Sequence, residues 1–250
     1  MLHQTRYELR AFLRNRQARY STMAMPLILV VALISAFGSR HVGRVEASTY
    51  YVPGIATLAV LAACFANLVT SVTTQRESGV LKRRRTTPVP PLVLIAARSV
   101  TAMAVALATV AAVCAAGALG FGVEPRAAAV PSLLLTCIVG SAALCCVAYA
   151  LSTAIHSADA AQPIVQAILL PLYFTSGVFI PTAELPGWVQ SAAQVLPVAH
   201  LSRAFHSAFD PRLHGVAVPW GDMAVLVAWG LPALAIAVTR FRWTPTAAAT

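Results

Sequence analysis

Long runs of apolar residues, separated by short polar segments, set the pattern of this 250-residue chain. The hydrocarbon core of a bilayer is about 30 Å thick, so a helix that crosses it needs about 20 apolar residues at a rise of about 1.5 Å each. Six runs are long enough, which predicts an all-α integral membrane protein with six transmembrane helices in a single domain, residues 1–250. The spans are predicted at about residues 21–38, 50–73, 99–121, 130–155, 162–180 and 220–239.

The composition supports a membrane protein and excludes other classes. Apolar residues make up 58% of the chain and charged residues 10%, and the mean hydropathy is +0.74. A soluble domain carries about 25% charged residues, so this chain has too few to cover a surface in water. It is also too apolar to be disordered.

The net charge of +10 is distributed unevenly along the chain. The segments 1–20, 74–98, 156–161 and 240–250 carry 13 of the 18 Lys and Arg residues and three acids, a net of 13 − 3 = +10. The other segments between spans carry five cations and four acids, and with the acid at the outer end of the last span, Asp222, their net charge is zero. Because an excess of Lys and Arg in short loops marks the cytoplasmic side, both termini are predicted to be cytoplasmic, and a nucleic-acid partner is excluded. A secretory signal is the alternative for the first apolar run, although the 20 residues before it are long for a charged leader.

Several kinds of chemistry are missing from the sequence. Ion-driven carriers usually bind their ion at an acid or His within the membrane, and all eight acids here lie between spans or within a turn of a span end. The one lysine, Lys82, has no P-loop around it, so no nucleotide site and no cofactor are expected on this chain. An intramembrane serine protease would need a Ser facing a His inside the membrane, and the six histidines lie outside the spans or at their ends. The five cysteines lack metal-ligand spacing with His, so no metal site is predicted and they are interpreted as packing residues. We therefore expect no enzyme.

Residues 1–20 are predicted to form an amphipathic helix at the membrane interface. Leucines at positions 2, 9 and 13 share one face, while Arg6, Arg10 and Arg14 follow at four-residue spacing on an adjoining face. This helix is expected to anchor the chain on the cytoplasmic side, and binding to a partner is the alternative left open.

The loop after the second predicted span, Gln75–Pro88, carries the sharpest pattern in the chain. It is predicted to form a short helix that ends at Thr87-Pro88, because the residue before proline disfavours helical backbone. The cations at positions 82–85 suit a topology anchor or anionic lipid headgroups. A topology signal does not explain the acid Glu77, the glycine Gly79 and the apolar Leu81 before them.

The segment between the fifth and sixth predicted spans is apolar but interrupted by prolines. Pro181, Pro186 and Pro197 break any continuous helix, and Trp188 suits the membrane interface. Broken backbone at membrane depth needs protein or a cavity to satisfy its polar groups. Broken re-entrant helices on the outer side are therefore predicted, with an ordinary extracellular loop as the alternative.

These two segments together resemble ABC transporter permeases of the type-2 export family. The pattern R-E-x-G-x-L followed by T-P is similar to the family's coupling loop, and S-G-x-x-x-P, L-P-x-W and a later proline are similar to its outer segment. The chain differs from many members at Lys82-Arg83, where Glu then Arg is common, which implies a more acidic groove on the partner. The matching loop residues are Arg76, Glu77, Gly79, Leu81, Thr87 and Pro88, and the matching outer residues are Ser176, Gly177, Pro181, Pro186, Trp188 and Pro197.

The resemblance implies a function and a set of partners. The loop would form a coupling helix that docks on ATP-binding cassette ATPase subunits, which bind ATP and Mg, and a second permease chain, identical or homologous, would complete the pore in a bacterial plasma membrane. The resemblance is closest to permeases that export drugs or antibiotics. Because no span offers a charge, an amphiphilic drug, antibiotic or lipid is the expected substrate. Polysaccharide export, an ion-gradient-driven multidrug carrier and a non-transporting membrane anchor are the alternatives.

Overall fold

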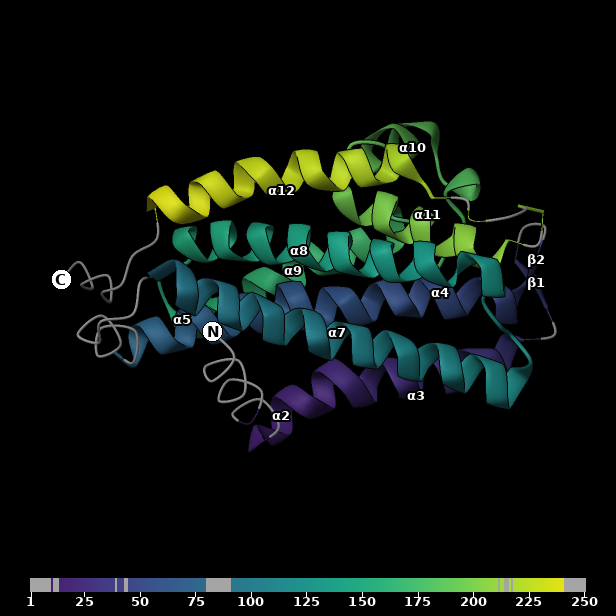
Figure 1. Ribbon diagram of the computed structural model, residues 1–250, viewed down its shortest axis with the longest axis horizontal. Helices are drawn as coiled ribbons and strands as arrows, with labels where there is room; N and C mark the ends of the chain where they lie inside the picture. The colour runs from purple at the N-terminus through teal and green to yellow at the C-terminus, as the bar shows by residue number, and fades with distance from the viewer. Residues whose placement is uncertain are drawn as a thin grey trace.

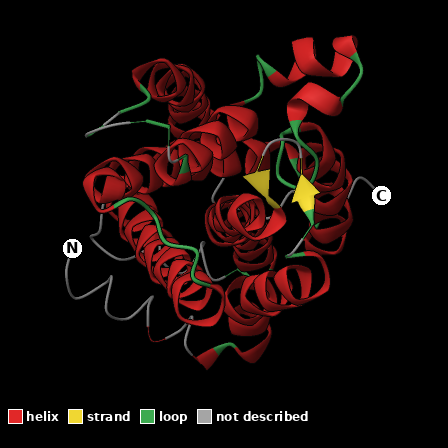
Figure 2. Cartoon of the chain, turned by 90° about the vertical axis from the view of Figure 1, so that its right-hand side faces the viewer, coloured by secondary structure: helices red, strands yellow, loops and turns green. Residues whose placement is uncertain are grey.

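The computed structural model is a bundle of helices whose axes run along the long dimension of the molecule (Figure 1). It describes residues 10, 14–38, 40–42, 45–79, 91–210, 212–213, 216 and 218–240. The hairpin of β1 (His41–Val42) and β2 (Val45–Glu46) lies at one end, where His41 pairs with Glu46. Figure 2 views the bundle from that end, with most of the helices seen nearly end-on.

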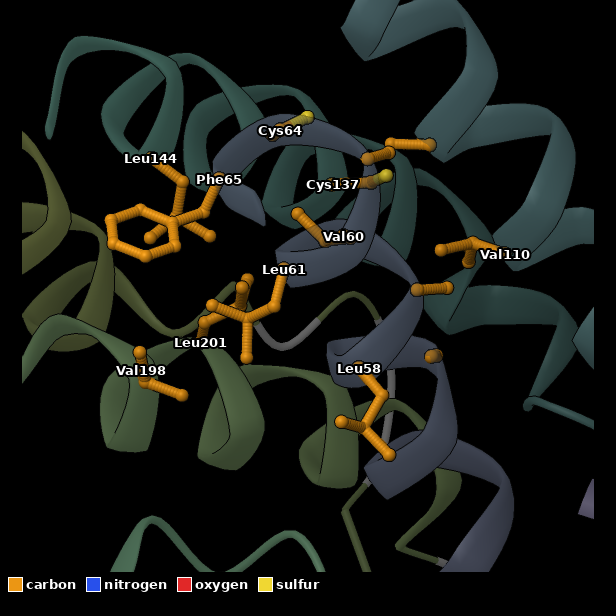
Figure 3. Close-up of a cluster of buried hydrophobic side chains, with 14 of the residues drawn as sticks. Leu58, Val60, Leu61, Cys64, Phe65, Val110, Cys137, Leu144, Val198 and Leu201 are labelled. Carbon is orange, nitrogen blue, oxygen red and sulfur yellow. The ribbon is translucent and has the colours of Figure 1, made fainter. Parts of the chain in front are cut away.

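One continuous helical unit forms the centre of the bundle. It consists of α4 (Ala47–Val60), the π-helical η2 (Leu61–Ala66) and α5 (Asn67–Glu77). Its side chains are mostly buried, because α3, α7, α8, α9 and α11 all contact it. Figure 3 shows part of this core, where Leu61 and Phe65 of η2 lie with Leu144 and Leu201 from two other helices.

Among the described residues, three further helices complete a set of four that are long and apolar enough to cross a membrane. They are α7 (Pro91–Phe121), α8 (Val130–Ala154, preceded by η3, Ala127–Ala129) and α12 (Trp220–Arg240). Small residues bring α12 close to α8, since a side chain added at Gly230 would lie 3.2 Å from the Cα atom of Ala143. Close approach of this kind is how helices associate in lipid, where the hydrophobic effect does not drive them together.

The other two predicted spans are shorter or more polar helices beside the central unit. The first is α3 (Met25–Phe37), preceded by α2 (Arg16–Arg19) and the π-helical η1 (Tyr20–Ala24), and it packs on α4. The second is α9 (Ala158–Thr175), which contains Pro163 and Pro171 and packs on α5. The bundle is therefore helical as predicted, and the count of six spans remains a prediction.

The C-terminal ends of α5 and α9 differ from those predicted, and glycines explain both. α5 continues to Glu77, so Arg76 and Glu77 end the second predicted span and do not start a separate short helix; Gly79, at φ 71°, follows. α9 begins at Ala158 and stops at Thr175, before Gly177 at φ 73°. A positive φ is accessible to glycine at no steric cost and ends a helix. Residues 80–90, with Leu81, Thr87 and Pro88, lie outside the described residues, as does Arg6.

Between α9 and α12 the chain forms three short helical pieces at the end of the bundle near the hairpin (Figure 1). They are η4 (Thr182–Glu184), α10 (Gly187–Ala193) and α11 (Pro197–Phe209). Pro181 and Pro186 immediately precede η4 and α10, and Pro197 is the first residue of α11. A proline in these positions costs nothing, because the first amides of a helix have no partner within it.

Candidate functional site: the helix junction and the adjoining cavity

Arg76 lies in the last turn of α5 and is only 4% exposed. Its guanidinium donates to two carbonyl oxygens at the end of α8, from Nη1 to Ser152 at 2.9 Å and from Nη2 to Ile155. The last carbonyls of a helix lack partners within it and form the negative end of its dipole. The Arg76 side chain therefore caps the C-terminus of α8.

Glu77, the next residue, contacts the start of the following helix. Its exposed carboxylate accepts a hydrogen bond from the backbone N–H of Ala158, the first residue of α9. The Oγ atom of Ser157 accepts from the N–H of Ala160 at 3.2 Å, as in a standard N-cap. A negative charge is favourable here, because the N-terminus is the positive end of the helix dipole.

Gly79 ends α5 directly after these two residues. The N–H of Ser78 donates to the carbonyl of Thr74 at 2.9 Å, and that of Gly79 donates to Arg76 at 3.2 Å. No atom lies within 4 Å of a Cβ built on Gly79, so its positive φ alone calls for glycine. We call the contacts of Arg76 and Glu77 with the α8–α9 turn the helix junction.

A cavity of about 880 Å³ adjoins the helix junction and extends from Ala158 to Phe179. Its walls come from α3 with the segment before it, from the central unit and from α9. The polar residues that line it are Asn15, Asn67, Thr70, Ser71, Thr74, Gln75, Gln162 and Gln166. The apolar and aromatic ones are Tyr20, Met25, Pro26, Leu29, Leu58, Ala62, Ala66, Ala158, Leu169, Tyr173 and Phe179.

Arg98 of α7 holds two polar side chains of the cavity wall in place. Its guanidinium donates to the Oε1 atom of Gln75 at 2.6 Å and to the hydroxyl of Ser71. These bonds orient both side chains, because an arginine has only donors to offer.

This cavity was not predicted from the sequence, although the spacing of polar residues gives a signal for it. Polar residues recur every three or four positions on α5, from Asn67 through Thr70 to Thr74, and Gln162 and Gln166 are four apart on α9. That spacing places each set on one face of its helix. When each residue is considered alone, without its spacing, it looks like an ordinary polar position in a span.

The start of the outer segment is held against α4. Ser176, Gly177 and Val178 are buried, and the hydroxyl of Tyr50 donates to the carbonyl of Gly177 at 2.5 Å. A Cβ on Gly54 would lie 2.4 Å from the carbonyl oxygen of Val178, so only glycine permits this approach. Farther along, Trp188 is 74% exposed and Pro186 is also exposed, whereas Pro197 is buried.

Two histidines of α11, not singled out from the sequence, are held by buried polar contacts. The Nδ1 atom of His200 lies 2.6 Å from Asp222 of α12, and its Nε2 atom lies 2.7 Å from the carbonyl of Gln194. Burial lowers the pKa of His206, whose Nδ1 atom lies 2.7 Å from the carbonyl of Ser202. The first pair joins α11 to α12. Within the described residues, no three His, Cys, Asp or Glu side chains gather closely enough to hold a metal ion.

The predicted cytoplasmic anchor is described only in part. Arg10 and Arg14 are helical and exposed, and α2 follows them directly in the chain. Arg6 lies outside the described residues.

Comparison with known proteins gives two findings. The sequence profile described as "ABC-2 type transporter" matches residues 3–209. A protein of Streptomyces coeruleorubidus named daunorubicin resistance ABC transporter permease protein DrrB1 is 29% identical over 215 residues, which cover 84% of this chain and 74% of that protein.

Proposed function

This chain belongs to the ABC-2 type transporter family, and on that premise we propose that it exports an amphiphilic drug, antibiotic or lipid from the cytoplasm or the inner leaflet. It is a multi-pass membrane permease, and ATP hydrolysis on a separate ATP-binding cassette subunit drives the export. The name of the DrrB1 relative supports drug export, because that protein is described as a daunorubicin resistance permease.

The composition of the cavity wall is the observation that carries the substrate class. Aromatic and aliphatic side chains offer contact to a ring system, and amides and hydroxyls offer hydrogen bonds to its polar substituents. Ligand pockets of about 300–1,000 Å³ are usually built in this way, and this cavity lies in that range. None of the described residues that line it is Asp, Glu, Lys, Arg or His, so a metal ion or a multiply charged solute would lose water there without meeting a side chain of opposite charge.

The arrangement of the bundle supports the proposed topology. The basic helix α2, the C-terminal end of α5 and the end of α12 at Arg240 lie toward one end, and the hairpin, α10 and α11 lie toward the other (Figure 1). We place the first end in the cytoplasm of a bacterium, with both chain termini there and with α3 and α9 as the first and fifth of the six spans. The short helices η4, α10 and α11 then form the outer re-entrant segment.

The same topology assigns the partners. The loop that contains Leu81, Thr87 and Pro88 follows α5 at the cytoplasmic end, where it meets the ATPase subunits. We expect the basic N-terminal segment, with Arg6, Arg10 and Arg14, to lie in the cytoplasmic interface. A second permease chain, identical or homologous, completes the pore.

Transport by the permease with its co-purified ATPase subunit tests this function. In inverted membrane vesicles, we expect ATP-dependent uptake of daunorubicin and of the fluorescent amphiphile rhodamine 6G. Uptake should persist when ionophores collapse the proton and sodium gradients, and it should stop when the P-loop lysine of the ATPase is replaced. Loss of uptake on collapse of the gradients, with ATP present, would show an ion-driven carrier. Absence of uptake under every condition would show a non-transporting anchor.

A further inference from the structure

We infer that Arg76 and Glu77 act inside the permease, where they clamp the α8–α9 turn to the end of α5 and pass movement of the following loop to both helices. This inference rests on the proposed function, since it concerns how ATP hydrolysis reaches the transport path. It assigns to the first two residues of the coupling-loop pattern a positioning role within the chain, instead of contact with the ATPase.

The burial of Arg76 supports this role. A guanidinium whose side chain is 4% exposed and which donates to the carbonyls of Ser152 and Ile155 presents little surface to another subunit. Its planar donors are used to hold two carbonyls that lie three residues apart at the end of α8. Movement of the end of α5 must therefore either move α8 or break these bonds.

Glu77 extends the same connection to α9. The carboxylate holds the N–H of Ala158, and Gln162 and Gln166 of the cavity wall follow one and two turns later on the same helix. Thr74 and Gln75, which precede the clamp on α5, line the facing part of the wall. The clamp therefore ties together the two helices that supply most of the polar wall of the cavity.

The charges of the two residues suit this geometry and not its reverse. Only residues 155–157 separate α8 from α9, so the negative end of one helix dipole and the positive end of the next lie side by side. The positive side chain of Arg76 binds the negative end of α8, and the negative side chain of Glu77 binds the positive end of α9. Because the two residues are adjacent at the end of α5 and opposite in charge, they can bind the C-terminus of α8 and the N-terminus of α9 at the same time.

Variants of Glu77 test the clamp, because an exposed carboxylate can be replaced without opening a hole in the core. Glu77→Ala removes the acceptor, whereas Glu77→Gln keeps a side-chain oxygen that can still accept from Ala158. Glu124→Ala is the matched control, since Glu124 is an exposed carboxylate between α7 and η3, outside the helix junction. Arg76→Lys keeps the positive charge but loses the two parallel donors of the guanidinium, so it tests the contact with the end of α8. Its control is Arg240→Ala, because Arg240 is an exposed cation at the same end of the bundle.

Three measurements are made on each variant. Hydrogen exchange of the permease alone, in nanodiscs, reports the protection of the Ala158 amide. Co-purification reports assembly with the ATPase subunit, and the ratio of rhodamine 6G transported to ATP hydrolysed reports coupling.

For Glu77→Ala we expect exchange at Ala158 to become about tenfold faster, the factor that loss of one charge-assisted hydrogen bond produces. We expect assembly to be retained and the transport ratio to fall severalfold. Glu77→Gln should restore most of the ratio, Arg76→Lys should lower it, and both controls should match the wild type.

Other outcomes overturn the inference in distinguishable ways. Unchanged exchange at Ala158 would disprove the clamp itself, and faster exchange with an unchanged transport ratio would disprove its role in coupling. Loss of assembly in Glu77→Ala would show direct contact with the ATPase. Absence of ATP-driven transport in the wild type would refute the proposed function and the coupling role together, and the exchange data would still report on the geometry.

Discussion

Arg76 and Glu77 stand next to each other in the chain, yet their side chains meet opposite poles of two different helices. The guanidinium binds carbonyls at the end of α8 and the carboxylate binds an amide at the start of α9. Each contact satisfies a backbone group that its own helix leaves unpaired. At the scale of single residues, Arg76 and Glu77 thus act as helix caps for two other helices, and Gly79 follows at the end of α5.

The requirement for glycine at position 79 can be measured by a matched pair. Gly79 and Gly120 both have open space where a Cβ would lie, and Gly79 has a positive φ. We expect Gly79→Ala to destabilise the permease by about 1 kcal/mol, the cost of left-handed backbone for an L-residue. Gly120→Ala, within α7, should be neutral or stabilise by about 0.5 kcal/mol, because alanine is the better helix former. Unfolding of the purified permease by SDS titration measures both, and equal effects would contradict the argument.

At the scale of elements, polar contacts fix how neighbouring helices and segments are arranged. Apolar packing alone is not directional, so it permits several arrangements. Arg98 joins α7 to α5 through Gln75 and Ser71, and Tyr50 joins α4 to the segment after α9 through Gly177. The Tyr50 bond is buried and the Arg98 bonds are partly buried, so each contributes direction as well as energy. The short helix α11 is fixed in the same way, through His200.

The contact between α11 and α12 gives a prediction for a double-mutant cycle. His200 and Asp222 are both largely buried and lie 2.6 Å apart. We expect His200→Ala and Asp222→Ala to show a coupling energy of about 1.5–3 kcal/mol, as for a hydrogen bond to a charged group. The pair of Arg203 with Asp222 is the control, because Arg203 is half exposed at 3.4 Å and exposed ion pairs contribute about 0–1 kcal/mol. A coupling energy no larger than that of the control would refute the link.

At the scale of the whole molecule, the cavity lies between helices that are distant in sequence and ends at the helix junction. The two π-helical segments, η1 and η2, both contribute to its wall and contact each other. Such segments are often found at functional sites, since they interrupt the regular hydrogen bonding of a helix. The cavity lies between the helix junction, at Ala158, and the start of the outer segment, at Phe179.

Filling the cavity should block transport without disturbing the rest of the assembly. Ala66 lines the cavity at the end of η2, so Ala66→Trp is expected to abolish most uptake of rhodamine 6G while co-purification with the ATPase is unchanged. Leu231→Trp is the matched control, because Leu231 is 62% exposed on α12 and its replacement adds bulk outside the bundle. Full transport by Ala66→Trp would place the substrate path elsewhere.

Apolar length and proline positions were enough to predict much of the fold. The long helices lie where runs of 20 or more apolar residues predict them, and the breaks after α9 lie at the prolines. Boundaries near polar residues were less predictable: α5 runs on to Glu77, because helical backbone continues past the apolar run until Gly79 stops it. The resemblance to type-2 permeases is confirmed by the comparisons.

The sequence alone determined that this is a helical membrane protein of the ABC-2 type, because hydropathy, charge asymmetry and short patterns are local properties of the chain. The tertiary structure decided what those patterns contact. Arg76 looks like an exposed docking residue when it is read beside Glu77, and only the approach of α8 to α5 shows it buried against Ser152. The cavity likewise exists only between helices, since Asn67 and Gln166 lie about a hundred residues apart and share a wall only after folding. Contacts between distant segments are set by packing, which no local pattern encodes.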